Sequence, residues 1–200
     1  MRLGILVSGR GSNLEAVLTA VSTGRLPRVE PVLVLSNRHG IRALSVAQRH
    51  GVATAVLAGR DFPDLAARDA AIGRALTAAH CDLALLAGYD QLLRPSYFAV
   101  FGGRTINIHP SLLPRHGGPG MMGLAVHEAV LVAGDRQTGV TIHEVTAELD
   151  RGAPIEQVAV AVLPDDTAER LAERVLAVEH QALVRVLAQL SASMTAAPRA

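Results

Sequence analysis

The 200-residue chain contains no lysine and no tryptophan, and its aromatic residues are two tyrosines and three phenylalanines. All 19 cationic side chains are therefore arginine, which excludes a Schiff-base lysine and the lysine of a P-loop. The lone cysteine, Cys81, excludes a disulfide framework and a cysteine-cluster metal site. With few rings to stack on bases and a formal net charge of +1, the chain is a poor candidate for binding nucleic acid.

Long apolar runs are also absent, because no stretch approaches the roughly 18 residues that a membrane helix requires. The first strand begins at Arg2 and leads into a glycine-rich turn, which leaves no room for a signal peptide, so we expect a cytoplasmic protein without membrane contact. Half of the residues are hydrophobic, and a chain of this length buries roughly 70% of its unfolded surface. We predict one domain over residues 1–190 and a frayed polar tail over residues 191–200.

The hydrophobic pattern alternates between short apolar runs and helical stripes. The apolar runs predict buried strands at residues 2–8, 30–36, 53–57, 82–87 and 104–109, with helical spacing between several of them. This order predicts a Rossmann-like α/β fold, in which a mostly parallel sheet has helices on both faces. A strand pair at 139–145 and 154–162 and a long closing helix at 167–190 complete the predicted domain.

The first candidate site is the turn Ser8-Gly9-Arg10-Gly11-Ser12-Asn13-Leu14, between the first strand and the first helix. Backbone N–H groups at the start of a helix attract anions, which favours a phosphate. A dinucleotide is disfavoured because Leu14 stands where the fingerprint has a third glycine, and because Ser36-Asn37-Arg38 offers a ribose no acidic residue. The alternative interpretation is a plain helix cap at Ser12 or Asn13.

The second candidate site is Asn107-Ile108-His109, at the end of the fifth predicted strand. Strand alternation puts Asn107 and His109 on one face, and ligands bind at the carboxyl ends of strands in open α/β sheets. An amide and an imidazole on the same face can stabilise a developing oxyanion. The alternative is a hydrogen-bonded pair with no role in chemistry.

Asp150 and Glu179 each allow a structural as well as a functional interpretation. Asp150, in Asp150-Arg151-Gly152, is on its own typical of a turn. Glu179 lies beside the apolar stripe of the last helix, where a carboxylate either reaches solvent or lines a pocket. No metal is expected, because ligand spacing is missing from the remaining candidates, which are His127, Glu128, His143 and Glu144.

The segment Pro110–Gly123 differs in composition from its surroundings, with four glycines and three prolines. We interpret it as a long loop, and long loops inside compact domains are usually functional. Because it follows His109 directly, it is either a mobile lid that excludes water or a rigid, proline-braced wall of the pocket. Both alternatives stay open.

These motifs in this order resemble the phosphoribosylglycinamide formyltransferase family. The resemblance is carried by Ser8–Leu14, Asn107–Pro114 and Glu148–Ile155, and it covers about residues 1–190. It implies transfer of a formyl group from the co-substrate 10-formyltetrahydrofolate to the amine of glycinamide ribonucleotide, a step of purine biosynthesis that requires no metal. A homodimer is one open alternative for the assembly.

The resemblance also implies a role for individual residues. Asn107, His109 and Asp150 form the catalytic trio. Gly11, Ser12 and Asn13 hold the ribonucleotide phosphate, and Glu179 contacts the glycinamide part of the substrate. The folate lies against two segments, which are Tyr89, Asp90, Gln91 and Leu92 in the first and Thr146, Ala147, Glu148 and Leu149 in the second.

The sequence departs from the family's pattern in two places. The usual Gly-Phe-Met-Arg or Gly-Phe-Met-Lys is Gly88-Tyr89-Asp90-Gln91 here, and Ala70 stands where many members have a folate-contacting arginine. Both departures concern the folate rather than the chemistry. The alternatives that stay open are a formyltetrahydrofolate hydrolase, a sugar-nucleotide formyltransferase, and a non-catalytic nucleotide-binding module.

Overall fold

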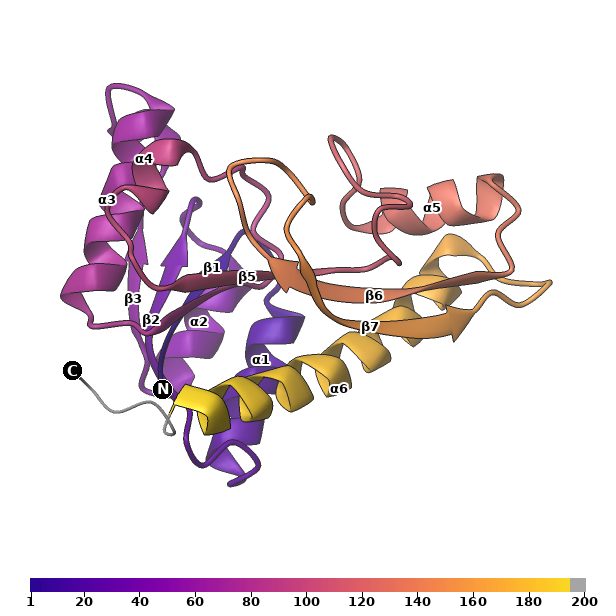
Figure 1. The fold of residues 1–200 in the computed structure, drawn as a ribbon, viewed down its shortest axis with the longest axis horizontal. Helices are drawn as coiled ribbons and strands as arrows, with labels where there is room; N and C mark the ends of the chain where they lie inside the picture. The colour runs from indigo at the N-terminus through magenta and orange to yellow at the C-terminus, as the bar shows by residue number, and fades with distance from the viewer. Residues whose placement is uncertain (195–200) are drawn as a thin grey trace.

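Seven strands form one sheet in the order β3-β2-β1-β4-β5-β6-β7 (Figure 1). Strands β1 to β5 pair in parallel, whereas β6 runs antiparallel to both β5 and β7. The computed structural model describes residues 1–194 and confirms the predicted fold class. The strands are Arg2–Val7, Glu30–Ser36, Ala53–Val56, Leu83–Leu86, Arg104–His109, Gln137–Glu144 and Pro154–Ala161 for β1 to β7.

Helices cover both faces of this sheet. On one face, α1 (Ser12–Ser22), α2 (Arg42–Arg49), α5 (Leu124–Val132) and α6 (Ala168–Met194) enclose one apolar cluster. On the other face, α3 (Leu65–Ala78) and the four-residue α4 (Pro95–Phe98) enclose a second cluster. A short 3-10 turn, η1, spans Gly59–Asp61.

The residues of strand β1 are apolar at consecutive positions because both faces of the strand are buried. Its alternate residues Leu3, Ile5 and Val7 lie in the first cluster, and Leu6 lies in the second. Gly4 also faces α3, where a Cβ atom would come within 2.2 Å of the side chain of Leu76. Both faces of β1 are therefore buried, as expected for the centre of a parallel sheet.

The last helix differs from its predicted bounds. Helix α6 ends at Met194, so the prediction of a frayed tail is wrong for residues 191–194. Ser191 is only 4% exposed, because the helix continues to pack along the domain beyond Leu190. The rest of the predicted tail, residues 195–200, lies outside the described residues. Helix α4 was not predicted, since one turn carries too little periodicity to detect.

The carboxyl ends of the parallel strands meet at one edge of the sheet. Leu6 of β1 is paired with Leu86 of β4, which is paired with Asn107 of β5. Residue His143 of β6 lies opposite Asn107 across the antiparallel pair. The turns after β1, β4 and β5 therefore leave the sheet beside one another, next to Asn107 and His109 at the end of β5.

Candidate active site

The turn after β1 leaves the start of α1 open. Gly11 precedes the helix with a φ of 78°, and no side chain caps the helix. The alternative of a cap supplied by Ser12 or Asn13 is therefore wrong. A side chain at Gly11 would put its Cβ atom 2.7 Å from that of Ala43, so the packing of α2 also requires glycine. Uncapped N–H groups at the positive end of a helix form a site for an anion.

Arginine side chains surround the same turn. Arg42 donates from Nη1 to the carbonyl oxygen of Arg10 at 3.2 Å, and Arg38 donates from Nη1 to that of Ser8 at 3.3 Å. Arg42 is also paired with Glu15 at 2.7 Å, whereas Arg10 is exposed. Arg38 is likewise paired with Asp90, so the exposed Arg10 is the charge that adds to the helix dipole and favours an anion such as a phosphate.

Two predicted ribonucleotide contacts, Asn13 and Glu179, meet beside this turn. The Glu179 carboxyl hydrogen-bonds Asn13, although the residues belong to α1 and α6 at opposite ends of the chain. Burial raises the pKa of Glu179 to about 7, and the hydrogen bond with Asn13 only partly opposes this shift. Asn13 Oδ1 is buried without a partner among the described residues. Both side chains therefore retain hydrogen-bonding capacity for a ligand.

The structure also brings Asn107, His109 and Asp150 together. Nδ1 of His109 lies 3.9 Å from Oδ2 of Asp150, and both side chains are less than a tenth exposed. Asn107 is connected to them through His143, whose Nε2 lies 3.1 Å from Asn107 Nδ2 and 3.7 Å from Asp150 Oδ1.

Asp150 reaches this position through an unusual turn. Its φ is 53°, a left-handed conformation that residues other than glycine seldom adopt. Two residues later, a Cβ atom on Gly152 would lie 1.6 Å from the carbonyl oxygen of Glu144. The Asp-Arg-Gly sequence therefore does form the expected turn, and the turn points a buried carboxylate at His109.

The sequence marks His143 only as a candidate metal ligand, and it does not reveal the place of His143 in this site. Its Nδ1 donates to the carbonyl oxygen of Glu144 at 2.8 Å, so its Nε2 is left to accept a hydrogen bond from Asn107. Burial is the main cause that lowers the pKa of His143, which keeps the ring neutral in this role. The strand register opposite Asn107 could have identified it, but the register follows only from the fold.

The loop Pro110–Gly123 packs onto His109 and Asp150. Nε2 of His109 donates to the carbonyl oxygen of His116 at 2.8 Å, and the backbone N–H of Gly118 donates to Asp150 Oδ2 at 2.8 Å. Gly117 lies close as well, since a Cβ atom there would be 3.4 Å from Cβ of Asp150. In the described state the loop therefore forms a wall of the site.

The first predicted folate segment is tied to the turn after β1. The backbone N–H of Asp90 donates to Oγ of Ser8 at 3.0 Å. The Asp90 carboxylate accepts from Nδ2 of Asn37 at 2.7 Å and forms an ion pair with Arg38. At position 90, where the family usually has methionine, Asp90 thus connects the turn after β4 to the turns after β1 and β2.

The side chain of Gln91, the neighbouring departure from the family's pattern, contacts a buried ion pair in α3. Gln91 accepts from Nη1 of Arg68 at 3.3 Å, and Arg68 is paired with Asp69 at 2.5 Å. Both members of that pair are almost fully buried, and Asp69 Oδ2 also accepts from the backbone N–H of Arg94 at 3.0 Å. This network holds segment 91–94 against α3. The second predicted folate segment, residues 146–149, is exposed.

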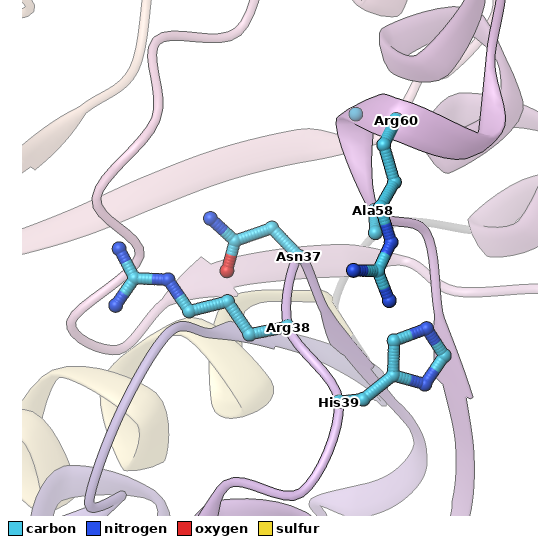
Figure 2. Close-up of a pocket in the computed structure, with 6 residues that line it drawn as sticks. Asn37, Arg38, His39, Ala58 and Arg60 are labelled. Carbon is cyan, nitrogen blue, oxygen red and sulfur yellow. The ribbon is translucent and has the colours of Figure 1, made fainter.

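Two cavities lie beside these residues rather than around the trio. One of about 410 Å³ lies at the ends of β2 and β3 (Figure 2), where Arg38 extends away from His39 and Arg60. The other, of about 250 Å³, is lined by His116, Asp135 and their neighbours.

Within residues 1–194, no group of three or more His, Cys, Asp or Glu side chains could hold a metal ion. No helix in that range is long and apolar enough to cross a membrane.

Comparison with known proteins identifies the family. Residues 1–187 match the model of the formyl transferase family. Phosphoribosylglycinamide formyltransferase of Haemophilus influenzae is 34% identical over 180 residues, which cover 90% of this chain and 82% of that protein. Glycinamide ribonucleotide transformylase 1 of Symbiobacterium toebii superposes with a TM-score of 0.90 at 37% identity, covering 96% of this chain and 88% of that one. The chain belongs to the formyl transferase family.

A further relative is a much longer protein. The trifunctional purine biosynthetic protein adenosine-3 of Drosophila melanogaster is 39% identical over 190 residues, which are 94% of this chain. Those residues are 14% of the relative, so this chain spans about one seventh of its length. The likeness therefore concerns one part of that protein.

Proposed function

We propose that this protein transfers the formyl group of 10-formyltetrahydrofolate to the amine of glycinamide ribonucleotide in purine biosynthesis. The observation that carries this proposal is the buried pairing of His109 with Asp150 at 3.9 Å, with Asn107 on the same strand. The uncapped start of α1 supports it, because the ribonucleotide carries a phosphate. The names of the relatives point to the same reaction.

The proposed reaction needs no covalent intermediate with the protein. The substrate amine attacks the formyl carbon, a C–N bond forms, and the carbonyl oxygen becomes an oxyanion. Nδ2–H of Asn107 donates to that oxygen, and in a dry site one such donor contributes about 3 kcal/mol. A protonated His109 stabilises the oxygen by its positive charge, because its two ring nitrogens face the His116 carbonyl and Asp150. Aligning two bound substrates supplies much of the remaining acceleration.

Asp150 has two tasks in this proposal. Its carboxylate faces Nδ1 of His109 at 3.9 Å and holds the ring in place, and it accepts the proton that leaves the attacking amine. The intermediate then collapses, the bond to N10 of the folate breaks, and N10 takes up the proton that Asp150 accepted from the amine. The products are tetrahydrofolate and the formylated ribonucleotide, so atoms and charges balance.

One assay separates this proposal from its alternatives. Release of tetrahydrofolate from 10-formyltetrahydrofolate is followed by absorbance, with and without glycinamide ribonucleotide. We expect release only when the ribonucleotide is present. Release in its absence would identify a hydrolase, and ribonucleotide binding without release would identify a non-catalytic module.

A further inference from the structure

The imidazole of His109 is held at both nitrogens. Nε2 lies 2.8 Å from the carbonyl oxygen of His116, and Nδ1 faces Oδ2 of Asp150 at 3.9 Å. A carbonyl oxygen can only accept, so Nε2 must carry a proton in this arrangement. When the ring is neutral, Nδ1 is then the nitrogen without a proton.

The carbonyl of His116 is itself fixed by its surroundings. His116 has a φ of 52°, which is uncommon for a residue other than glycine. Its side chain contacts the carboxylate of Asp135 through Nε2 at 2.7 Å. Oγ of Ser111 donates to the carbonyl oxygen of Arg115 at 2.7 Å, one residue earlier in the loop. The loop backbone is thus anchored from both sides of this carbonyl.

Asp135 is a firm anchor for the His116 ring. It follows α5, and its backbone N–H donates to the carbonyl oxygen of Val130 at 3.3 Å. The hydrogen bond from His116, followed by the charge of Arg115, lowers the pKa of Asp135 and keeps its carboxylate ionised. Arg115 binds the other oxygen through Nη2 at 2.6 Å, but its side chain is 68% exposed. The partly buried contact with His116 is therefore the one that fixes the conformation of the loop.

We propose that His116 and Asp135 are a positioning pair for His109, which rests on the formyl transfer proposed above. The pair holds the His116 carbonyl where it binds Nε2–H of His109. This contact orients the ring and assigns the exchangeable proton to Nδ1, the nitrogen beside Asp150. Neither His116 nor Asp135 touches substrate in this proposal; both act through His109.

His80 provides a matched control within the same chain. It also has a left-handed backbone, with a φ of 51°, but it is exposed in the turn after α3, on the other face of the sheet. Glycine adopts positive φ readily, so His116→Gly and His80→Gly each remove a histidine ring while relieving the same kind of backbone strain. Only the first replacement also removes a contact with Asp135.

The first test is steady-state kinetics with both substrates. We expect His116→Gly and Asp135→Ala to lower kcat by about 10- to 100-fold, because a misplaced catalytic group loses alignment, while each KM changes less than about threefold. Asp135→Asn keeps an oxygen that accepts from His116, and we expect it to recover most of kcat. His80→Gly should match the unaltered protein. Equal kcat in His116→Gly and His80→Gly would overturn the proposal.

The second test does not depend on activity. In protein labelled with ¹⁵N-histidine, NMR reports which nitrogen of His109 is protonated when the ring is neutral. We expect the Nε2–H tautomer in the unaltered protein and in His80→Gly, and a mixture of tautomers in His116→Gly and Asp135→Ala. An unchanged tautomer in those two variants would overturn the positioning pair. Absence of formyl transfer by the unaltered protein would overturn only the proposed function.

Discussion

The two ends of the candidate active site differ in how far the protein satisfies its own polar groups. Around His109 the groups are paired with one another: Asn107 donates to His143, and Asp150 accepts from the backbone of Gly118. At the start of α1 they are left open, because the helix has no side-chain cap and Oδ1 of Asn13 is buried without a partner among the described residues.

This difference suggests a division of labour. A buried polar group without a partner costs about 1–3 kcal/mol, so a ligand that supplies the partner gains binding energy there. A completed network gains little from a ligand, but it fixes the direction of each donor and acceptor before the reaction begins. We therefore expect changes near His109 to lower kcat and changes near Asn13 to weaken binding.

The largest effect is expected from the trio itself. Replacing Asn107, His109 or Asp150 with alanine should each lower kcat by about 100-fold or more, because each group acts on the transition state. Double variants should lose less than the product of the single losses, since the three act as a unit. Steady-state turnover measures both effects, and near-normal turnover in His109→Ala would refute the mechanism.

The open end should respond differently. Asn13→Ala removes a side chain that we expect to contact the ribonucleotide, so its dissociation constant should rise by about tenfold, equivalent to the loss of one hydrogen bond. Calorimetry with a folate analogue should give an unchanged affinity. The reverse pattern would show that the two substrates have been assigned to the wrong ends of the site.

Gly11→Val is a useful contrast to that variant. Its Cβ atom would meet Ala43 at 2.7 Å in a backbone with a φ of 78°, so we expect a lower Tm as well as weaker ribonucleotide binding. A variant at Gly11 therefore mixes folding with binding, whereas Asn13→Ala introduces no steric clash at the turn.

The contrast between the two ends also explains what could be predicted from the sequence. The strands β1 to β5 follow from local apolar runs, and Asn107 and His109 follow from strand alternation at the end of β5. The roles of His143 and His116 do not follow, because one depends on the register of β6 against β5 and the other on the path of a loop. Such contacts join residues whose spacing in the chain carries no periodic signal.

A smaller effect is expected from the pH dependence of Glu179. Burial raises its folded-state pKa to about 7 from an ordinary 4.5, so the folded protein binds a proton here that the unfolded chain has released. This contribution to stability is present below pH 4.5, declines as the pH rises to about 7, and then stays constant. The total loss over that window is at most about 3 kcal/mol.

Glu179→Gln should remove this decline. Urea unfolding at several pH values gives the difference in unfolding free energy between the variant and the unaltered protein, and that difference should grow between pH 4.5 and 7. Glu173→Gln, at an exposed position of the same helix, is the matched control. A constant difference across the window would show that Glu179 is solvated in the folded protein.

The smallest effect concerns the loop Pro110–Gly123. We expect its first part to be a rigid wall of the site and its last part to be mobile. Its first part is tied down: the backbone N–H of Leu113 donates to Oγ1 of Thr141 at 3.0 Å, and Gly118 donates to Asp150. Its last part, residues 119–123, is mostly exposed. We expect amide hydrogen exchange to find residues 111–118 protected without ligand, as in a rigid wall. Residues 120–123 should exchange freely and gain only slight protection with a folate analogue. Strong ligand-induced protection across the whole loop would instead favour a lid, and would mean that the network around His109 is completed only when the substrate binds.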